Sequence, residues 1–448
     1  MDYLKIAESV IAQAEKEGFE AEAYINHGSQ TEINVDRGEV EKLSHAGSKG
    51  IGIRVFRDGK MGYAFTSDFS LVNIQQTTKN AMTLAEISDA DEHRLLPDPE
   101  PIPEGDLELF DPNLQSLPME KKIEFAQLTE KAALEADSRV MMTNRTTYFD
   151  GIQQVALVNS KGFSGSYQST FVAGFLMAMA MDGDDRTTAF GLGVSSFLED
   201  VDPQKIGADA GQKAARLLGG KPVETQQAPV VYSPFAASGI LGAISRALTA
   251  EAMQKNRSFL HGKMGQDVAS DVVTLLDNGR LPRGMATRPF DDEGVPTRAT
   301  KLIDEGVLQT VLQDSYTARK DGGQSTGNAV RGSHRQAPSL SSSNFYIQPG
   351  PDSPEDVIAN VESGLYVVNT MNTNSINPVS GDYSVSAQGF WIENGKLTHP
   401  VNGVTVAIPL DQLLMNVKAV ANDLIFLPFM GAIGTPTIRI DNVMIGGL

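Results

Sequence analysis

Cysteine is absent from this 448-residue chain. Its absence excludes disulfides, thiolate metal ligands and a cysteine nucleophile, and it fits a cytoplasmic protein. Basic residues are few, because 37 Lys and Arg stand against 56 Asp and Glu and give a net charge of −19. A chain this acidic repels phosphate backbones and anionic membrane surfaces, so we expect no direct binding to nucleic acid or membrane.

Long hydrophobic runs are also lacking. The most apolar stretch, residues 171–181, is well short of the ~20 residues that a membrane-spanning helix requires. The N-terminus has neither the basic nor the apolar region of a signal peptide. We interpret residues 171–181 as a buried strand, with an apolar ligand-binding surface as the less favoured alternative.

The first half of the chain alternates between two periodicities. Period-two patterns predict strands between residues 19 and 65 and at 140–149 and 155–158, with turns at Arg57–Lys60 and Asp150-Gly151. Proline-rich residues 88–118 predict an extended strap. Apolar residues at helical spacing predict four helices, at residues 2–17, 67–87, 119–136 and 203–218.

The second half begins with a predicted strand at 229–232 and a nearly uncharged helix at 235–250, which should be buried. Turn signals predict hairpins at Asp304–Gly306 and Glu393–Lys396. Further helices are predicted at 353–363 and 410–421, and a final strand at 435–445. This mixture predicts an α+β fold. We expect an N-terminal α/β sandwich-like domain at 1–225 and a strand-rich C-terminal domain with packed helices at 226–448.

Common catalytic motifs are missing. The nearest pair of histidines, His27 and His45, is 18 residues apart, so no two imidazoles share a helical turn as in a His-Glu-x-x-His zinc site. No Gly-Lys-Ser or Gly-Lys-Thr phosphate loop occurs. The segment Gly162–Ser166 fails the Gly-x-Ser-x-Gly pattern of a nucleophile elbow. The sequence therefore indicates no nucleophile.

One acidic cluster and several arginines remain as candidates. Asp291, Asp292 and Glu293 could ligate a hard cation or supply a general base, although a solvated turn before Gly294 is the favoured interpretation. Guanidinium groups match carboxylates well, so some arginines of this region could clamp a carboxylate or a peptide terminus. Surface ion pairing is at least as well supported for them. These arginines are Arg319, Arg331 and Arg335.

Eight short tracts in order carry a family resemblance. They are the strand pattern of Glu41–Gly52, the helix at 234–250, Arg257–Leu260, Phe290-Asp-Asp-Glu-Gly-Val-Pro296, Asp304–Leu308, Ser325-Thr-Gly-Asn328, Gly389–Gly395 and Gly434–Ile438. Through these tracts the chain resembles the TldD/PmbA family, once called modulators of DNA gyrase and now regarded as metalloproteases. The charge of −19 gives no physical support for contact with DNA itself.

The resemblance also discriminates between two branches. The TldD branch carries His-Glu-x-x-x-His on the helix that begins its C-terminal domain, and a later cysteine completes the metal site. Counted from Pro234, the matching positions here are Gly242, Ala243 and Ala247, and no cysteine exists. The chain is therefore similar to the PmbA/TldE branch. This implies no metal in this chain and zinc in a TldD-type partner.

The resemblance implies a subunit that pairs, with a TldD-type chain or with itself, around a chamber where unfolded or extended peptides are cut. Strand addition is one way to hold such peptides. We expect the chain to be inactive alone. The alternatives are a self-sufficient metallopeptidase that uses Asp291–Glu293 or His261, and a homodimeric peptide-binding protein. The candidate chamber or peptide-contacting residues are Asp291, Asp292, Glu293, Arg319, Asn328 and Arg331.

Overall fold

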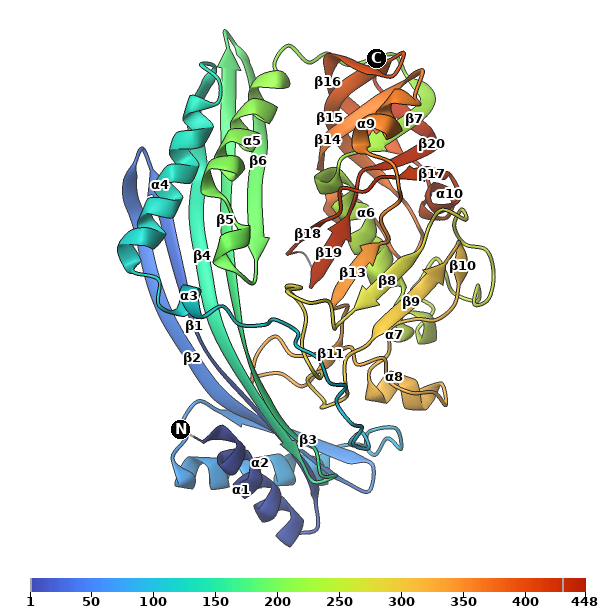
Figure 1. The fold of residues 1–448 in the computed structure, drawn as a ribbon. Coiled ribbons are helices and arrows are strands. Elements are labelled where there is room, and N and C mark those ends of the chain that lie inside the picture. The colour runs from blue at the N-terminus through green and yellow to red at the C-terminus, as the bar shows by residue number, and fades with distance from the viewer. Residues whose placement is uncertain (1, 429–430) are drawn as a thin grey trace.

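The first half of the chain forms one long, curved antiparallel sheet (Figure 1). The structure is a computed structural model that describes residues 2–428 and 431–448. The strand order is β3-β2-β1-β4-β5-β6. The strands are β1 (Glu20–Asp36), β2 (Glu39–Arg57), β3 (Lys60–Thr66), β4 (Val140–Asn159), β5 (Ser164–Asp182) and β6 (Asp185–Ser195). The strands and the Arg57–Lys60 turn predicted from period-two alternation are confirmed.

The predicted turn at Asp150-Gly151 is wrong, because both residues lie inside the continuous strand β4. Gly151 stands opposite Gln30 of β1 and Phe171 of β5. A Cβ atom at Gly151 would lie 2.3 Å from the Phe171 ring. The glycine therefore allows close packing across the sheet and does not mark a turn.

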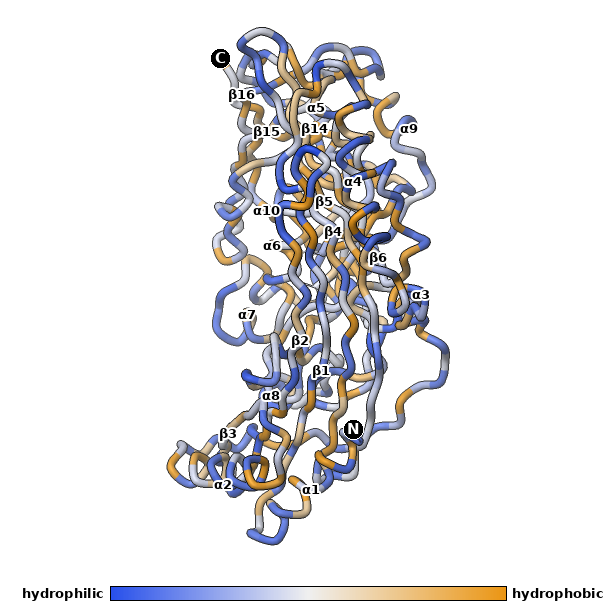
Figure 2. The backbone as a smooth tube through the Cα atoms, turned by 90° about the vertical axis from the view of Figure 1, so that its left-hand side faces the viewer, coloured by the Kyte–Doolittle hydropathy of each residue, from blue (hydrophilic) through white to orange (hydrophobic). Residues whose placement is uncertain are grey.

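Two pairs of helices cover the sheet. The helices α4 (Met119–Glu135) and α5 (Pro203–Arg216) pack over β4, β5 and β6, while α1 (Tyr3–Lys16) and α2 (Leu71–Ile87) pack near its other end (Figure 1). Alternate residues of β5 are buried in the core formed with α4 and α5. The stretch 171–181 is thus a strand, as predicted, but only one of its faces is fully buried. In Figure 2 apolar and polar residues mix along the long strands.

Residues 88–118 run in an extended course with one short helix, α3 (Pro112–Gln115), and pass from the sheet to the C-terminal half. Arginines of the C-terminal half hold this strap. Arg319 donates to the carbonyls of Leu95 and Leu96 at 2.7 and 2.6 Å, and Arg280 donates to that of Pro103 at 2.9 Å. The strap is therefore anchored to the C-terminal half of the molecule.

The second half contains a closed barrel. Its sheet has the order β16-β15-β14-β7-β20-β17, and an extra pairing of β16 with β20 closes five strands into a ring. The ring strands are β7 (Gln226–Tyr232), β14 (Ser363–Met371), β15 (Ser384–Glu393), β16 (Lys396–Ala407) and β20 (Ile438–Gly446). The sixth strand of the sheet, β17 (Val417–Val420), pairs with β20. The fold is thus α+β, as predicted from the mixture of periodicities.

A second C-terminal sheet has the order β10-β9-β8-β13-β19-β18. Its strands are β8 (Leu275–Asn278), β9 (Ala299–Asp304), β10 (Val307–Leu308), β13 (Asn344–Ile347), β18 (Ile425–Leu427) and β19 (Ala432–Thr435). The helix α6 (Pro234–Ala247) contacts strands of both C-terminal sheets and lies in their shared core. Its predicted burial is confirmed.

The remaining elements are short: α7 (Ala250–Gln254), α8 (Ser315–Lys320), α9 (Pro354–Ala359), α10 (Leu410–Met415), β11 (Ala329–Val330) and β12 (Ser339–Leu340). The helices predicted at 353–363 and 410–421 are present, but both are shorter than predicted. Each ends early because the next strand of the same sheet, β14 or β17, begins there. Among the described residues, no helix has the length and apolar character needed to cross a bilayer.

Candidate functional site

The acidic cluster lies in a tight turn that is buried between the two halves. Phe290 and Pro296 form a β-bridge around it, and Gly294 has a φ of 85°, which favours glycine. Asp291, Asp292 and Glu293 are 0, 3 and 4% exposed. The solvated-turn interpretation is therefore wrong, because the N-terminal sheet covers the turn.

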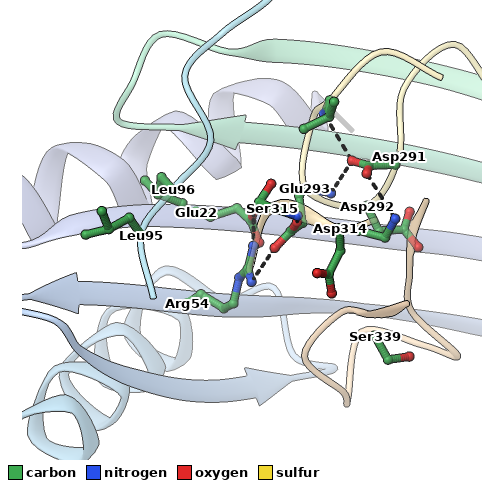
Figure 3. Close-up of polar contacts among 12 residues, drawn as sticks. Glu22, Arg54, Leu95, Leu96, Asp291, Asp292, Glu293, Asp314, Ser315 and Ser339 are labelled. Carbon is green, nitrogen blue, oxygen red and sulfur yellow. Dashed lines mark hydrogen bonds and ion pairs between the residues drawn. The ribbon is translucent and has the colours of Figure 1, made fainter. Parts of the chain in front are cut away.

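Ion pairs join this turn to the sheet (Figure 3). Arg54 of β2 binds Glu22 of β1 at 2.7 Å and Glu293 of the turn at 3.0 Å. Arg331 also binds Glu22, and its backbone N–H donates to Asp292 at 2.5 Å. All these side chains are buried. Surface ion pairing is therefore wrong for Arg331, whose side chain lies inside this network.

The network holds four carboxylates, Glu22 and Asp291–Glu293, against three guanidiniums. The third guanidinium is Arg288, whose Nη1 lies 3.5 Å from Asp292. Among the described residues, Asp291 alone of the four carboxylates has no ion pair. It accepts backbone N–H groups of Glu293, Val295 and Ala329 instead.

Burial and the neighbouring charge of Glu293 raise the pKa of Asp291 to about 8. Burial opposes the charged form of Glu293 as well. Arg54 and the Ser315 amide outweigh that effect, so the pKa of Glu293 is lowered. With one carboxylate in excess over the guanidiniums, a single proton held at Asp291 balances the buried charge.

The stability of the protein should therefore fall as the pH rises from 6 to 8. The folded state keeps a proton at Asp291, whose pKa is about 8, while the unfolded state has lost it above the ordinary value of 3.8. The free energy of unfolding then falls by up to about 1.4 kcal/mol per pH unit and levels off above pH 8. Urea denaturation between pH 6 and 9 measures this slope. Asp291→Asn should flatten it, and a wild-type stability that rises across this window would show Asp291 to be ionised.

The other candidate residues lie in different places. Asn328 is buried and donates to Asp277 at 2.7 Å, while Arg319 holds the strap. Arg335 is exposed, with no ion pair among the described residues. The exposed ring of His261 contacts the carbonyl of Met253 and takes no part in the acidic network.

Sequence reasoning missed three members of the network: Arg288, and the pair Glu22 and Arg54. Glu22 and Arg54 stand directly opposite each other in the antiparallel pair β1–β2. Opposite charges at matching hairpin positions could have indicated this cross-strand pair. Nothing in the local pattern predicts that Glu293, which follows Arg54 by 239 residues, covers this pair.

The helix α6 offers no donor atoms at the positions that matter for a metal. Ala243 and Ala247 are fully buried in the C-terminal core, and Gly242 has open space beside its Cα. A glycine and two alanines supply no side-chain ligand. Within residues 2–428 and 431–448, no group of three or more His, Asp or Glu is placed to hold a metal ion. The residues present at these positions therefore do not fit a zinc ion.

A groove runs between the two halves beside β6. Its first cavity, of about 260 Å³, lies between β6 residues Phe190 and Leu192 and the start of α6 at Ser233–Phe235. The next, of about 520 Å³, lies between Leu192–Ser195 of β6 and Ile425–Leu427 of β18. Among the residues that the structure describes, β6 and β18 are end strands of their sheets, so each has an edge without a strand partner beside this groove.

Three family models match the chain in order and identify its parts as metallopeptidase-type domains. They are PmbA/TldA metallopeptidase domain 1 over residues 21–85, the central domain over 112–218 and the C-terminal domain over 225–447. The chain belongs to the PmbA/TldD metallopeptidase family. The resemblance inferred from the eight tracts is thereby confirmed.

Several relatives match over nearly the full length. Metalloprotease PmbA of Escherichia coli O157:H7 is 29% identical over 90% of this chain and 88% of its own length. A TldD homologue of Haemophilus influenzae is 24% identical over 95% and 92%. The solved structure of TldE from Thermococcus kodakarensis has a TM-score of 0.89 at 25% identity, over 99% and 100%. A Thermotoga maritima protein described as a candidate modulator of a DNA gyrase has a TM-score of 0.90 at 25% identity, over 99% and 100%.

Proposed function

We propose that this chain is a subunit without a metal site in a cytoplasmic TldD/TldE-type metalloprotease. It pairs with a TldD-type chain, helps to enclose a chamber and holds unfolded or extended peptides there. The observation that carries the proposal is α6, which has Gly242, Ala243 and Ala247 where ligands are expected in a TldD chain. The zinc belongs to the partner in this proposal.

The groove beside β6 supports the peptide-binding part. An extended peptide can satisfy its backbone N–H and C=O groups on a free strand edge without a sequence requirement. The groove presents two such edges, β6 and β18, with apolar side chains such as Leu192 and Ile425 along it. Three members of the acidic network, Arg288, Asp292 and Arg331, line a further cavity next to it.

The test is co-expression of this chain with a TldD-type chain. We expect a mixed dimer by native mass measurement and cleavage of an unstructured peptide only by the pair. The lone chain should bind less than one zinc per chain and cleave nothing, because α6 offers no ligands. Cleavage by the lone chain with stoichiometric zinc would support a self-sufficient metallopeptidase. Homodimers without any gain of activity would contradict the mixed dimer.

A second arm of this test addresses the groove. Leu192→Arg places a charged side chain where two cavities meet, and we expect the affinity for a labelled unstructured peptide to fall about tenfold. Leu43→Arg is the control, since Leu43 is exposed on β2 and lines neither cavity of the groove. Equal affinities of the two variants would contradict peptide binding in the groove.

A further inference from the structure

A third cavity, of about 270 Å³, lies where the N-terminal sheet meets the loops around the acidic cluster. The sheet contributes Tyr24 and Tyr167, and the C-terminal loops contribute Arg288, Asp292 and Arg331. The pairing pattern explains the site, because β1 and β5 both flank β4 and bring their side chains to one face. This cavity shares the wall residues Gly284 and Met285 with the groove between β6 and β18.

Arg288 is under-bonded for a buried guanidinium. Its side chain is only 12% exposed, and its one ion pair, to Asp292, is long at 3.5 Å. Its Nε is buried and has no hydrogen-bond partner among the described residues. Buried arginine N–H groups are nearly always bonded, because leaving such a charged donor unpaired is costly. Because Arg288 also lines the cavity, an acceptor bound there can pair with its guanidinium.

The side chains that line the cavity include hydrogen-bond donors that suit an anion. Its lining carries two guanidiniums, Arg288 and Arg331, against one carboxylate, Asp292. Arg331 is already occupied, since it binds Glu22 and the carbonyl of Asp292. Arg288 is thus the cation with donors to spare, in a chain whose net charge is −19.

Tyr167 adds a second donor. Burial and the charge of Asp292 raise its pKa, while the neighbouring Arg288 opposes that rise. The hydroxyl therefore stays protonated at neutral pH and can donate a hydrogen bond beside the guanidinium. A guanidinium and a hydroxyl together match the two oxygens of a carboxylate.

The position of the cavity along β6 suggests where the carboxylate comes from. Successive residues of the strand line the three cavities in order: Phe190 the first, Val194 the second and Ser196, just past its end, the third. A peptide lying along the edge of β6 would thus reach Arg288 where the strand ends.

We propose that Arg288 and Tyr167 form a carboxylate-binding site at the end of the groove, where they anchor an extended peptide. This deepens the proposed peptide-binding role and rests on it. If the C-terminal carboxylate of the peptide is bound, the peptide must run parallel to β6, because β6 itself runs toward this cavity. An Asp or Glu side chain could be bound in either direction.

The first experiment uses a small probe on the full-length chain. N-acetylphenylalanine and its amide differ only in the carboxylate, and saturation-transfer NMR measures their binding. We expect the acid to bind about tenfold or more tightly than the amide, because charge-assisted bonds form only with the acid. Arg288→Gln should abolish the difference, while Arg335→Gln, a change at an exposed arginine, should preserve it. Arg288→Lys should retain part of it.

A second experiment uses a labelled unstructured dodecapeptide in three forms: free acid, amide, and amide with one internal Glu. If the free acid binds most tightly, the site binds the C-terminal carboxylate of the peptide. If the free acid and the Glu form bind equally, the site accepts a carboxylate from either the C-terminus or a side chain. Equal binding of N-acetylphenylalanine and its amide to the wild type overturns the site, as does a preference that survives in Arg288→Gln. If the acid probe binds through Arg288 but no dodecapeptide binds, the site stands and the proposed peptide-binding role fails.

Discussion

Replacing Arg54 with methionine is expected to lower the free energy of unfolding by about 3–5 kcal/mol. The substitution leaves Glu22 and Glu293 buried without their shared guanidinium, which bridges them at 2.7 and 3.0 Å. The loss should be largest at the contact between the two halves, because Glu22 lies in the first and Glu293 in the second. Urea denaturation followed by circular dichroism measures it.

The single tryptophan provides a second readout of the same variant. Trp391 is buried in β15 of the barrel, so its fluorescence follows the C-terminal half alone. We expect the fluorescence and circular-dichroism transitions to separate in Arg54→Met. Arg139→Met is the control, because Arg139 pairs with Asp137 at the surface and such pairs contribute about 1 kcal/mol or less. If Arg54→Met and Arg139→Met unfold alike, the network does not hold the halves together.

Ala243→Glu is expected to cost more than about 3 kcal/mol or to prevent accumulation of the folded chain. Ala243 is fully buried in α6 among aliphatic side chains, so a glutamate there brings an unpaired carboxylate into the core and overpacks it. Thermal unfolding and soluble yield measure the effect. On this expectation, the helix does not tolerate a glutamate at position 243.

The neighbouring position supplies the matched control. A Cβ atom at Gly242 meets no atom within 4 Å, so Gly242→Glu adds the same side chain to the same helix with room for it. We expect a change of about 1 kcal/mol or less, since the added helix propensity opposes the partial burial of charge. Equal costs at positions 242 and 243 would contradict the burial argument.

The local pattern of the sequence was enough to predict most of the fold. Alternation located the strands of the long sheet, and turn residues located the hairpins at Asp304–Gly306 and Glu393–Lys396. The local pattern was not enough where contacts with distant parts of the chain determine the local structure. Asp150-Gly151 reads as a turn because Gly is common there, yet its use is close packing against Phe171.

The site was harder to predict, because its geometry depends on long-range contacts. Alternation marks Glu22 as a polar residue on an outward face, but the turn at Asp291–Glu293 covers that face. The same contact buries the turn that seemed solvated in isolation. The buried Nε of Arg288 also has no sequence signal, because only the structure reveals that it has no hydrogen-bond partner among the described residues.

The ion network also has a consequence for synthesis. Glu293 follows Arg54 by 239 residues, so at about 5–20 residues per second it emerges roughly 10–50 s later. During that interval Glu22 and Arg54 have only each other across the hairpin β1–β2. The first half of a nascent chain must therefore tolerate this sheet face in contact with water. This face is covered only after the turn at Asp291–Glu293 and then Arg331 have been synthesised, near the start of the last quarter of translation.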